Sequence, residues 1–114
     1  MKRWWRFYET RAGRRPVKEF LTKLSDIDAA AVAVEMRDVA GEGTRAARHL
    51  RGEIYEVRAD GDRQTFRILF APEGRRGHVL LALEAFSKKT RRTPKQALDL
   101  AERRLADWRR RGTR

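Results

Sequence analysis

The chain has 114 residues, which is enough for one domain and too few for two. It contains no cysteine, which excludes disulfides, thiolate metal ligands and a cysteine nucleophile, and we expect a reducing, cytoplasmic location. No apolar run reaches membrane-spanning length, and the N-terminal segment lacks the apolar core of a secretory signal, so no membrane partner is expected.

The formal net charge is +12, from 28 Lys and Arg against 16 Asp and Glu. This charge is uneven: residues 1–24 carry +6, residues 25–87 carry −2 and residues 88–114 carry +8. A field of this sign attracts phosphate backbones and accelerates association with them. We therefore expect a polyanionic partner such as RNA, although an acidic protein surface would also satisfy the charge.

The first half of the chain predicts one strand followed by two helices. Residues 4–9 are rich in aromatic side chains, as is typical of a strand. Pro16 opens a helix with apolar residues at helical spacing, because proline is favoured at the first helical position. Ser25 or Asp26 caps a second, alanine-rich helix that ends at residues 41–43. The two helices are close in sequence, so we expect a helical hairpin.

The second half changes to the two-residue period of strands. Strands are predicted at residues 54–59, 65–71 and 79–86, with turns at 60–62 and 72–77 between them. Short turns join these strands, so they form an antiparallel meander. The segment before the first of them, which contains His49, is expected to be a connecting loop.

A last helix completes the predicted fold. Thr93 is expected to cap this helix, Pro94 to start it, and residues 109–114 to fray. The predicted order is β-α-α-β-β-β-α in a single α+β domain covering residues 1–114. An antiparallel sheet forms its core, and the helical hairpin and the last helix cover that sheet.

Histidines and glycines carry no recognisable catalytic or metal-binding spacing. His49 and His78 are 29 positions apart without any cysteine, and no HExxH, nucleophile-elbow or glycine-rich phosphate motif is present. We therefore expect no metal and no cofactor, and both histidines are best interpreted as surface or structural residues.

The basic residues on the predicted sheet are more informative. Arg58 and Arg67 lie on neighbouring strands and both point away from the apolar face, so they share one face of the sheet. Lysines and arginines then follow the last strand. Such a face beside a basic strand end is suited to bind phosphate, and the alternative is an ordinary solvated sheet face. The candidate RNA-binding residues here and in the preceding turn are Arg63, Lys88, Arg91 and Arg92.

Two stretches of the chain resemble the RelE/HigB superfamily of toxin–antitoxin toxins, in particular its phage-derived HigB-like branch. They are LRGEIYEVRADGDRQTFRILF at 50–70 and VLLALEAFSKKTRRTPKQALDLAERR at 79–104. The shared features are a strand with a Tyr-Glu-x-Arg pattern, an aromatic-Arg pair on the next strand, and a Phe-x-Lys-Lys-Thr-x-x-Thr-Pro segment that enters the last helix. The β-α-α start also matches, so the resemblance covers essentially the whole chain.

This resemblance implies a RelE-like fold and a metal-independent, ribosome-associated endoribonuclease that cuts messenger RNA. The 2′-OH of the RNA would attack the adjacent phosphorus and expel the 5′-oxygen. The resemblance places Arg58, Arg67 and Lys89 at basic positions of the family's site, and we assign charge stabilisation to Arg67 with Arg58 orienting the backbone.

The general base has two candidates. Lys89 lies among other cations, which favour its neutral, basic form. Glu56 is the second candidate, and it departs from the lysine that the best-studied branch carries at this position. A further departure is that Pro94 and Lys95 stand where some members carry a catalytic aromatic residue or histidine.

Three other functions remain open from the sequence. A ParE-like toxin would share the fold but inhibit DNA gyrase without cutting RNA. A nonenzymatic nucleic-acid-binding module would bind in a salt-dependent way without product, and an inactivated toxin is compatible with Glu56. A toxin of this kind implies a cognate antitoxin, expected to contain a helix-turn-helix and to be encoded next door, besides the ribosome and mRNA.

Overall fold

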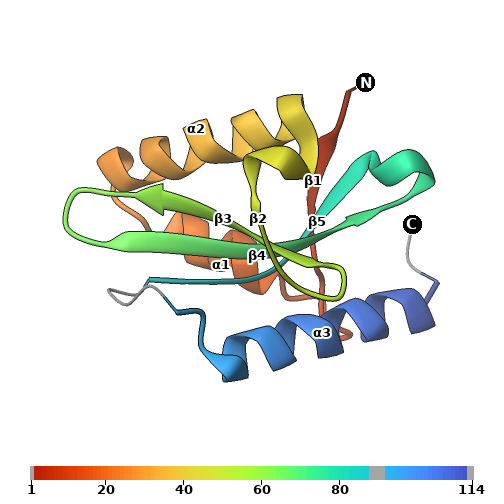
Figure 1. Cartoon of the computed structure of the whole chain (residues 1–114). Helices are drawn as coiled ribbons and strands as arrows, with labels where there is room; N and C mark the ends of the chain where they lie inside the picture. Colours follow the sequence, from red (N-terminus) through yellow and green to blue (C-terminus); the bar gives the residue numbers. More distant parts are fainter. Residues whose placement is uncertain (1, 88–91, 113–114) are drawn as a thin grey trace.

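The structure is a computed structural model that describes residues 2–87 and 92–112. It is an α+β arrangement, as expected, and Figure 1 traces its path through the sheet and the helices. The elements in chain order are β1 (Trp4–Phe7), α1 (Pro16–Thr22), α2 (Asp26–Glu42), the 3₁₀ turn η1 (Gly43–Ala46), β2 (Arg48–Arg51), β3 (Ile54–Asp60), β4 (Thr65–Glu73), the 3₁₀ turn η2 (Arg75–Gly77), β5 (Val79–Ser87) and α3 (Lys95–Arg110).

The sheet has five strands in the order β1-β5-β4-β3-β2, and it corrects two expectations. It is mixed rather than antiparallel, because β1 pairs parallel with β5 while β3, β4 and β5 form the predicted antiparallel meander. A short additional strand, β2, replaces the expected loop and places His49 opposite Tyr55. The four residues of β2 lack an alternating pattern, so only the pairing with β3 makes them a strand.

The N-terminal helices begin where the sequence predicts. Pro16 is the first residue of α1, and the Ser25 hydroxyl accepts a hydrogen bond of 3.2 Å from the backbone N–H of Asp28. This bond satisfies one of the free amide groups in the first turn of α2. Helix α2 ends before Gly43, whose φ of +80° is a conformation that glycine adopts at low cost.

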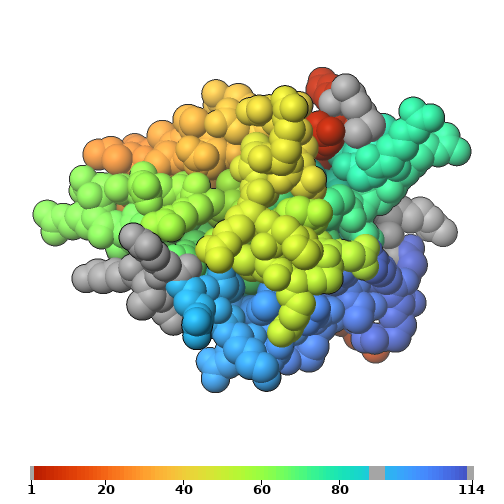
Figure 2. Space-filling view, viewed as in Figure 1, coloured from red at the N-terminus to blue at the C-terminus, as the bar shows by residue number. Residues whose placement is uncertain are grey.

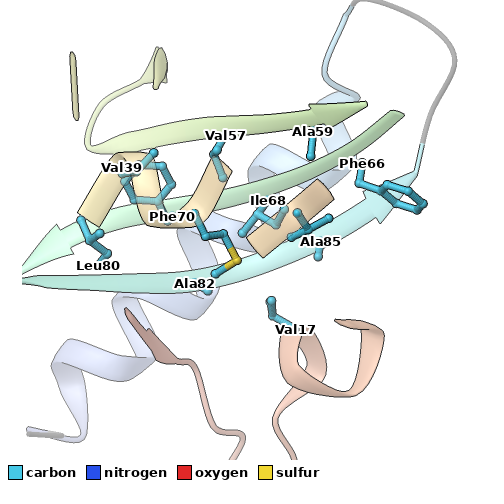
Figure 3. Packing of buried hydrophobic residues seen from close by; sticks show 12 residues of the cluster. Val17, Val39, Val57, Ala59, Phe66, Ile68, Phe70, Leu80, Ala82 and Ala85 are labelled. Carbon is cyan, nitrogen blue, oxygen red and sulfur yellow. The ribbon is translucent and has the colours of Figure 1, made fainter. Parts of the chain in front are cut away.

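One face of the sheet packs against α1 and α2. Figure 3 shows Val57, Ile68 and Phe70 from the sheet, together with Val17 of α1 and Val39 of α2, in one apolar cluster. These side chains are at most 2 % exposed. The alternating residues of β3 and β4 therefore place their predicted apolar face against α1 and α2.

The opposite face of the sheet packs against α3, so the molecule has three layers (Figure 1). Leu69, Leu81 and Leu83 of the sheet lie against Leu105 and Trp108 of this helix. Within the described residues, no helix has the length and apolar character needed to cross a membrane.

Ion pairs anchor the end of α3 that we expected to fray. The helix continues to Arg110, and Arg109 donates hydrogen bonds of 2.6–2.8 Å to the carboxylates of Glu53 and Glu73. The Tyr8 hydroxyl adds a bond of 2.6 Å to Asp107. The structure thus differs from the expectation at residues 109 and 110, because these contacts come from segments distant in sequence.

Candidate phosphate-binding site

Arg58 and Arg67 share the α3-facing side of the sheet, as their spacing predicts. They are direct cross-strand partners in the antiparallel pairing of β3 and β4. Glu56 is two residues before Arg58 and therefore lies on the same face. Three charged side chains are thus brought together at one end of the sheet by local strand geometry alone.

These three side chains differ in burial and in partners. Arg67 is fully buried and Glu56 is 3 % exposed, and Arg67 Nη1 lies 3.7 Å from Glu56 Oε2. The side chain of Arg58 is 49 % exposed, with its Nε 3.9 Å from Asp60. The face is therefore neither fully solvated nor a uniform row of exposed cations: Arg58 faces solvent, and Arg67 pairs with a buried carboxylate.

Thr93 completes this buried network. Its hydroxyl donates a hydrogen bond of 2.6 Å to Glu56 Oε2. The expectation that Thr93 caps the last helix is wrong, because α3 starts at Lys95, Pro94 occupies the cap position, and no side chain caps the helix. The buried carboxylate binds the hydroxyl instead, which ties the start of α3 to β3.

A depression lies beside this network, and we name it the arginine depression. Its volume is about 360 Å³, and it is lined by Arg45, Ala46, Ala47, Arg48, Glu56 and Arg58. Arg48 of β2 is directly opposite Glu56 of β3. A carboxylate at the wall of a site with three guanidinium groups can accept a proton while the cations hold phosphate oxygens.

Arg45 and Arg48 were not among the residues predicted from the sequence. Both lie in the segment that we expected to be a loop, and η1 and β2 turn them toward β3. One signal was available, because arginines recur at every third position at 45, 48 and 51, just before the first strand of the meander. This local pattern does not indicate which strand the segment will pair with.

The remaining predicted RNA-binding residues are placed differently. Arg63 is in the turn between β3 and β4, with a side chain that is 91 % exposed, and it does not line the arginine depression. Arg92 lies next to Thr93, in the segment just before α3. The predicted residues Lys88, Lys89 and Arg91 lie outside the described residues.

The two histidines make structural contacts. His49 Nε2 lies 2.7 Å from the carbonyl oxygen of Gly52, and the ring of His78 stacks on Trp4 with 6.1 Å between centroids. No cluster of three or more His, Cys, Asp or Glu side chains suited to a metal ion occurs in the described part of the chain. The expectation of a metal-independent site stays a prediction.

Fold and site together define a small basic α+β domain with an arginine-lined depression beside one face of its sheet. Residues 19–106 match the model of the family described as phage-derived protein Gp49-like (DUF891). The chain therefore belongs to this family of HigB/RelE-like toxins. It is similar to the probable endoribonuclease HigB1 of two Mycobacterium tuberculosis strains, CDC 1551/Oshkosh and ATCC 25618/H37Rv. Against each it is 36 % identical over 110 residues, which cover 93 % of this chain and 85 % of the relative.

Proposed function

We propose that this chain is the toxin of a toxin–antitoxin pair and acts as an endoribonuclease that cleaves messenger RNA on the ribosome. The arginine depression carries the proposal, because three arginines surround a carboxylate on an open part of a sheet face. The name of the mycobacterial relatives, probable endoribonuclease, supports RNA as the substrate. The sheet, the helical hairpin and the last helix are compatible with a RelE-like fold.

The chemistry is a transfer within the RNA itself. The 2′-OH loses its proton and attacks the adjacent phosphorus, and the bond to the 5′-oxygen breaks. The products are a 2′,3′-cyclic phosphate and a 5′-hydroxyl. The protein must accept one proton, stabilise the extra negative charge on the phosphoryl oxygens and supply a proton to the leaving oxygen.

Burial divides the roles of the arginines. Arg58 is exposed at the arginine depression, so its planar guanidinium can hold two phosphoryl oxygens and stabilise their charge. Arg67 is fully buried against Glu56 and is better suited to orient that carboxylate than to touch the RNA. This division transfers to Arg58 the charge stabilisation that we first assigned to Arg67.

Glu56 is the candidate general base among the described residues. It lines the depression, and its Oε2 atom is held by Thr93 and Arg67. An orientation fixed in this way favours proton transfer, because a base must lie within hydrogen-bonding reach of the 2′-OH. Lys89 remains the second candidate.

Primer extension on an mRNA that is being translated tests the proposal. Purified protein is expected to produce discrete cuts, which appear as stops at the new 5′-hydroxyl ends. Arg58→Ala should slow cutting by about 10²-fold. Arg75→Ala is the matched control, because this exposed arginine in η2 does not line the arginine depression. No cuts under translation, together with inhibition of gyrase, would indicate the ParE-like alternative.

Glu56→Gln separates the two candidate bases. Glutamine still offers Thr93 an acceptor but cannot take a proton, so a loss of about 10²- to 10⁴-fold is expected if Glu56 is the base. A nearly unchanged rate would move the role to Lys89, and Lys89→Met should then abolish cutting.

The partner of this toxin would be an antitoxin that contains a helix-turn-helix and is encoded next to it. A strongly basic toxin suits an acidic segment of that partner, which can order on binding. Co-expression of the neighbouring reading frame should yield a stable complex and suppress cutting of mRNA.

A further inference from the structure

A second depression adjoins the arginine depression at the start of α3, and we name it the leucine pocket. Its volume is about 540 Å³, and it is lined by Arg48, Leu50, Arg92, Thr93 and Leu98. Arg48 lines both depressions. On the face shown in Figure 2, the yellow-green segment around β2 lies against the light-blue start of α3. The two depressions therefore follow one another, with Arg48 between them.

The walls of the leucine pocket are held by packing and by ion pairs. Leu50 and Leu98 are partly buried and pack against the apolar cluster under α3. Next to them, Arg51 Nη2 lies 2.7 Å from Asp99 Oδ1, and the same nitrogen also pairs with Glu102. The hydrogen bond from Arg51 lowers the pKa of Asp99 below its usual range, so this carboxylate stays charged at neutral pH. The pocket is therefore present before any ligand binds.

The chemistry of this lining combines an apolar slot with a cationic rim. Leu50 of β2 and Leu98 of α3 supply its apolar lining, and Arg48 and Arg92 supply its cationic lining. Arg48 is exposed, and its side chain makes no hydrogen bond or ion pair with the described part of the chain. Its guanidinium is available to an anion at the point where the two depressions meet.

We propose that the leucine pocket binds a nucleobase of the RNA next to the scissile phosphate, and that Arg48 holds the phosphate that links this nucleotide to the reacting one. This inference rests on the proposed function, since it places the scissile phosphate at Arg58. Apolar side chains can sandwich a flipped-out base, and ligand pockets for small molecules start at about 300 Å³. The leucine pocket thus suits a flat nucleobase with an attached phosphate better than it suits an inorganic anion.

Thr93 connects the two depressions chemically. It lines the leucine pocket, and its hydroxyl is hydrogen-bonded to Glu56, which lines the arginine depression. A base in the pocket would therefore lie beside the residue that holds the candidate general base. The nucleotide whose base occupies the leucine pocket is then expected to affect where the RNA is cut, and not only how tightly the protein binds the RNA.

The test uses a short RNA that carries a 2′-deoxyribose at the cut site, so that it binds without being cleaved. Fluorescence anisotropy measures its Kd, and each base in turn is replaced by an abasic site. In the wild-type protein, one position next to the cut site should lose about tenfold in affinity when its base is removed. In Leu98→Ala, removal of the same base should change affinity less than about twofold.

Two further variants test the parts of the proposal. Arg48→Ala should weaken binding by about tenfold and reduce the salt dependence by the equivalent of one phosphate contact. Leu50→Ala, on the edge strand β2, is the second pocket variant if Leu98→Ala does not fold. Arg75→Ala and Leu100→Ala are controls, because neither residue lines the pocket.

The outcomes distinguish the pocket from the proposed activity. The proposal of a base-binding pocket is wrong if the wild type and both leucine variants show the same change in Kd for every abasic RNA. It is also wrong if Arg48→Ala and Arg75→Ala bind the RNA equally well. If the wild-type protein gives the expected abasic profile but never cuts an all-ribose RNA during translation, the nuclease proposal fails and the pocket stands.

Discussion

Arg58 and Arg67 are direct partners across β3 and β4, yet one is half exposed and the other is fully buried. The difference comes from their neighbours on the same face. Arg67 lies on a strand between β3 and β5 and pairs with the buried carboxylate of Glu56, whereas the side chain of Arg58 lies beside the exposed Asp60. Two residues of one type, on one face and in register, are therefore expected to respond to mutation in different ways.

Arg67→Ala is expected to destabilise the fold. It removes a buried guanidinium and leaves the Glu56 carboxylate without its ion-pair partner, which typically costs about 3–5 kcal/mol. Urea denaturation followed by circular dichroism measures this loss. A free energy of unfolding within about 0.5 kcal/mol of wild type would show that the pair contributes nothing to stability.

Arg58→Ala is expected to spare the fold and impair function. Its side chain is exposed, so the free energy of unfolding should change by less than about 0.5 kcal/mol. The rate of RNA cutting should fall by about 10²-fold, because a charge on the phosphoryl oxygens loses its stabiliser. A variant that cuts normally at saturating RNA would remove Arg58 from the site.

Thr93→Val removes the hydroxyl that binds Glu56 and keeps the shape of the side chain. A hydrogen bond to a charged group typically contributes about 1.5–3 kcal/mol, and that is the expected loss in the free energy of unfolding. Thr93→Ser retains the hydroxyl and should recover most of the stability. Equal losses in both variants would mean that the methyl group matters more than the hydrogen bond.

Acid should weaken the attachment of α3. A hydrogen bond from Arg109 lowers the pKa of Glu53, and one from the Tyr8 hydroxyl lowers the pKa of Asp107. A carboxylate with a depressed pKa contributes stability above its unfolded pKa and loses it as the pH falls through its folded pKa. Melting temperatures should therefore drop between about pH 5 and pH 2.5. Glu53→Gln should show a shallower drop, and an identical drop would assign the effect to other groups.

Ser25→Ala tests the cap of α2. The variant loses the side-chain acceptor for the amide of Asp28, and such caps contribute about 0.5–2 kcal/mol. Ser25→Asp keeps an acceptor at the same position and should retain the stability. Chemical denaturation of the three proteins gives the comparison, and equal midpoints for all three would show that solvent replaces the cap.

Several features of the molecule follow from short stretches of sequence. The alternation in residues 54–59 and 65–71 was enough to place Arg58 and Arg67 on one face, because strand side chains alternate whatever the strand pairs with. Pro16 and Ser25 likewise mark helix starts through their own backbone and side-chain chemistry.

The site itself needed contacts between distant segments. Thr93 looks like a helix cap in its own segment, but in the fold it binds Glu56, 37 positions away. The same holds for Arg48, whose segment becomes a strand only by pairing with β3. The local sequence does not say which distant segment such a residue will meet. That depends on how the whole chain packs.

The sequence alone determined the cationic character of the protein, the three strands of the meander and the face that holds its two arginines, since charge and strand periodicity are local properties. Only the tertiary structure decided the parallel pairing of β1, the burial of Arg67 and the depressions around Arg48. The physical reason is that burial and pocket shape depend on what packs above a residue. At the leucine pocket, for example, Leu98 of α3 lies opposite a lining residue of β2, Leu50, from which it is far removed along the chain.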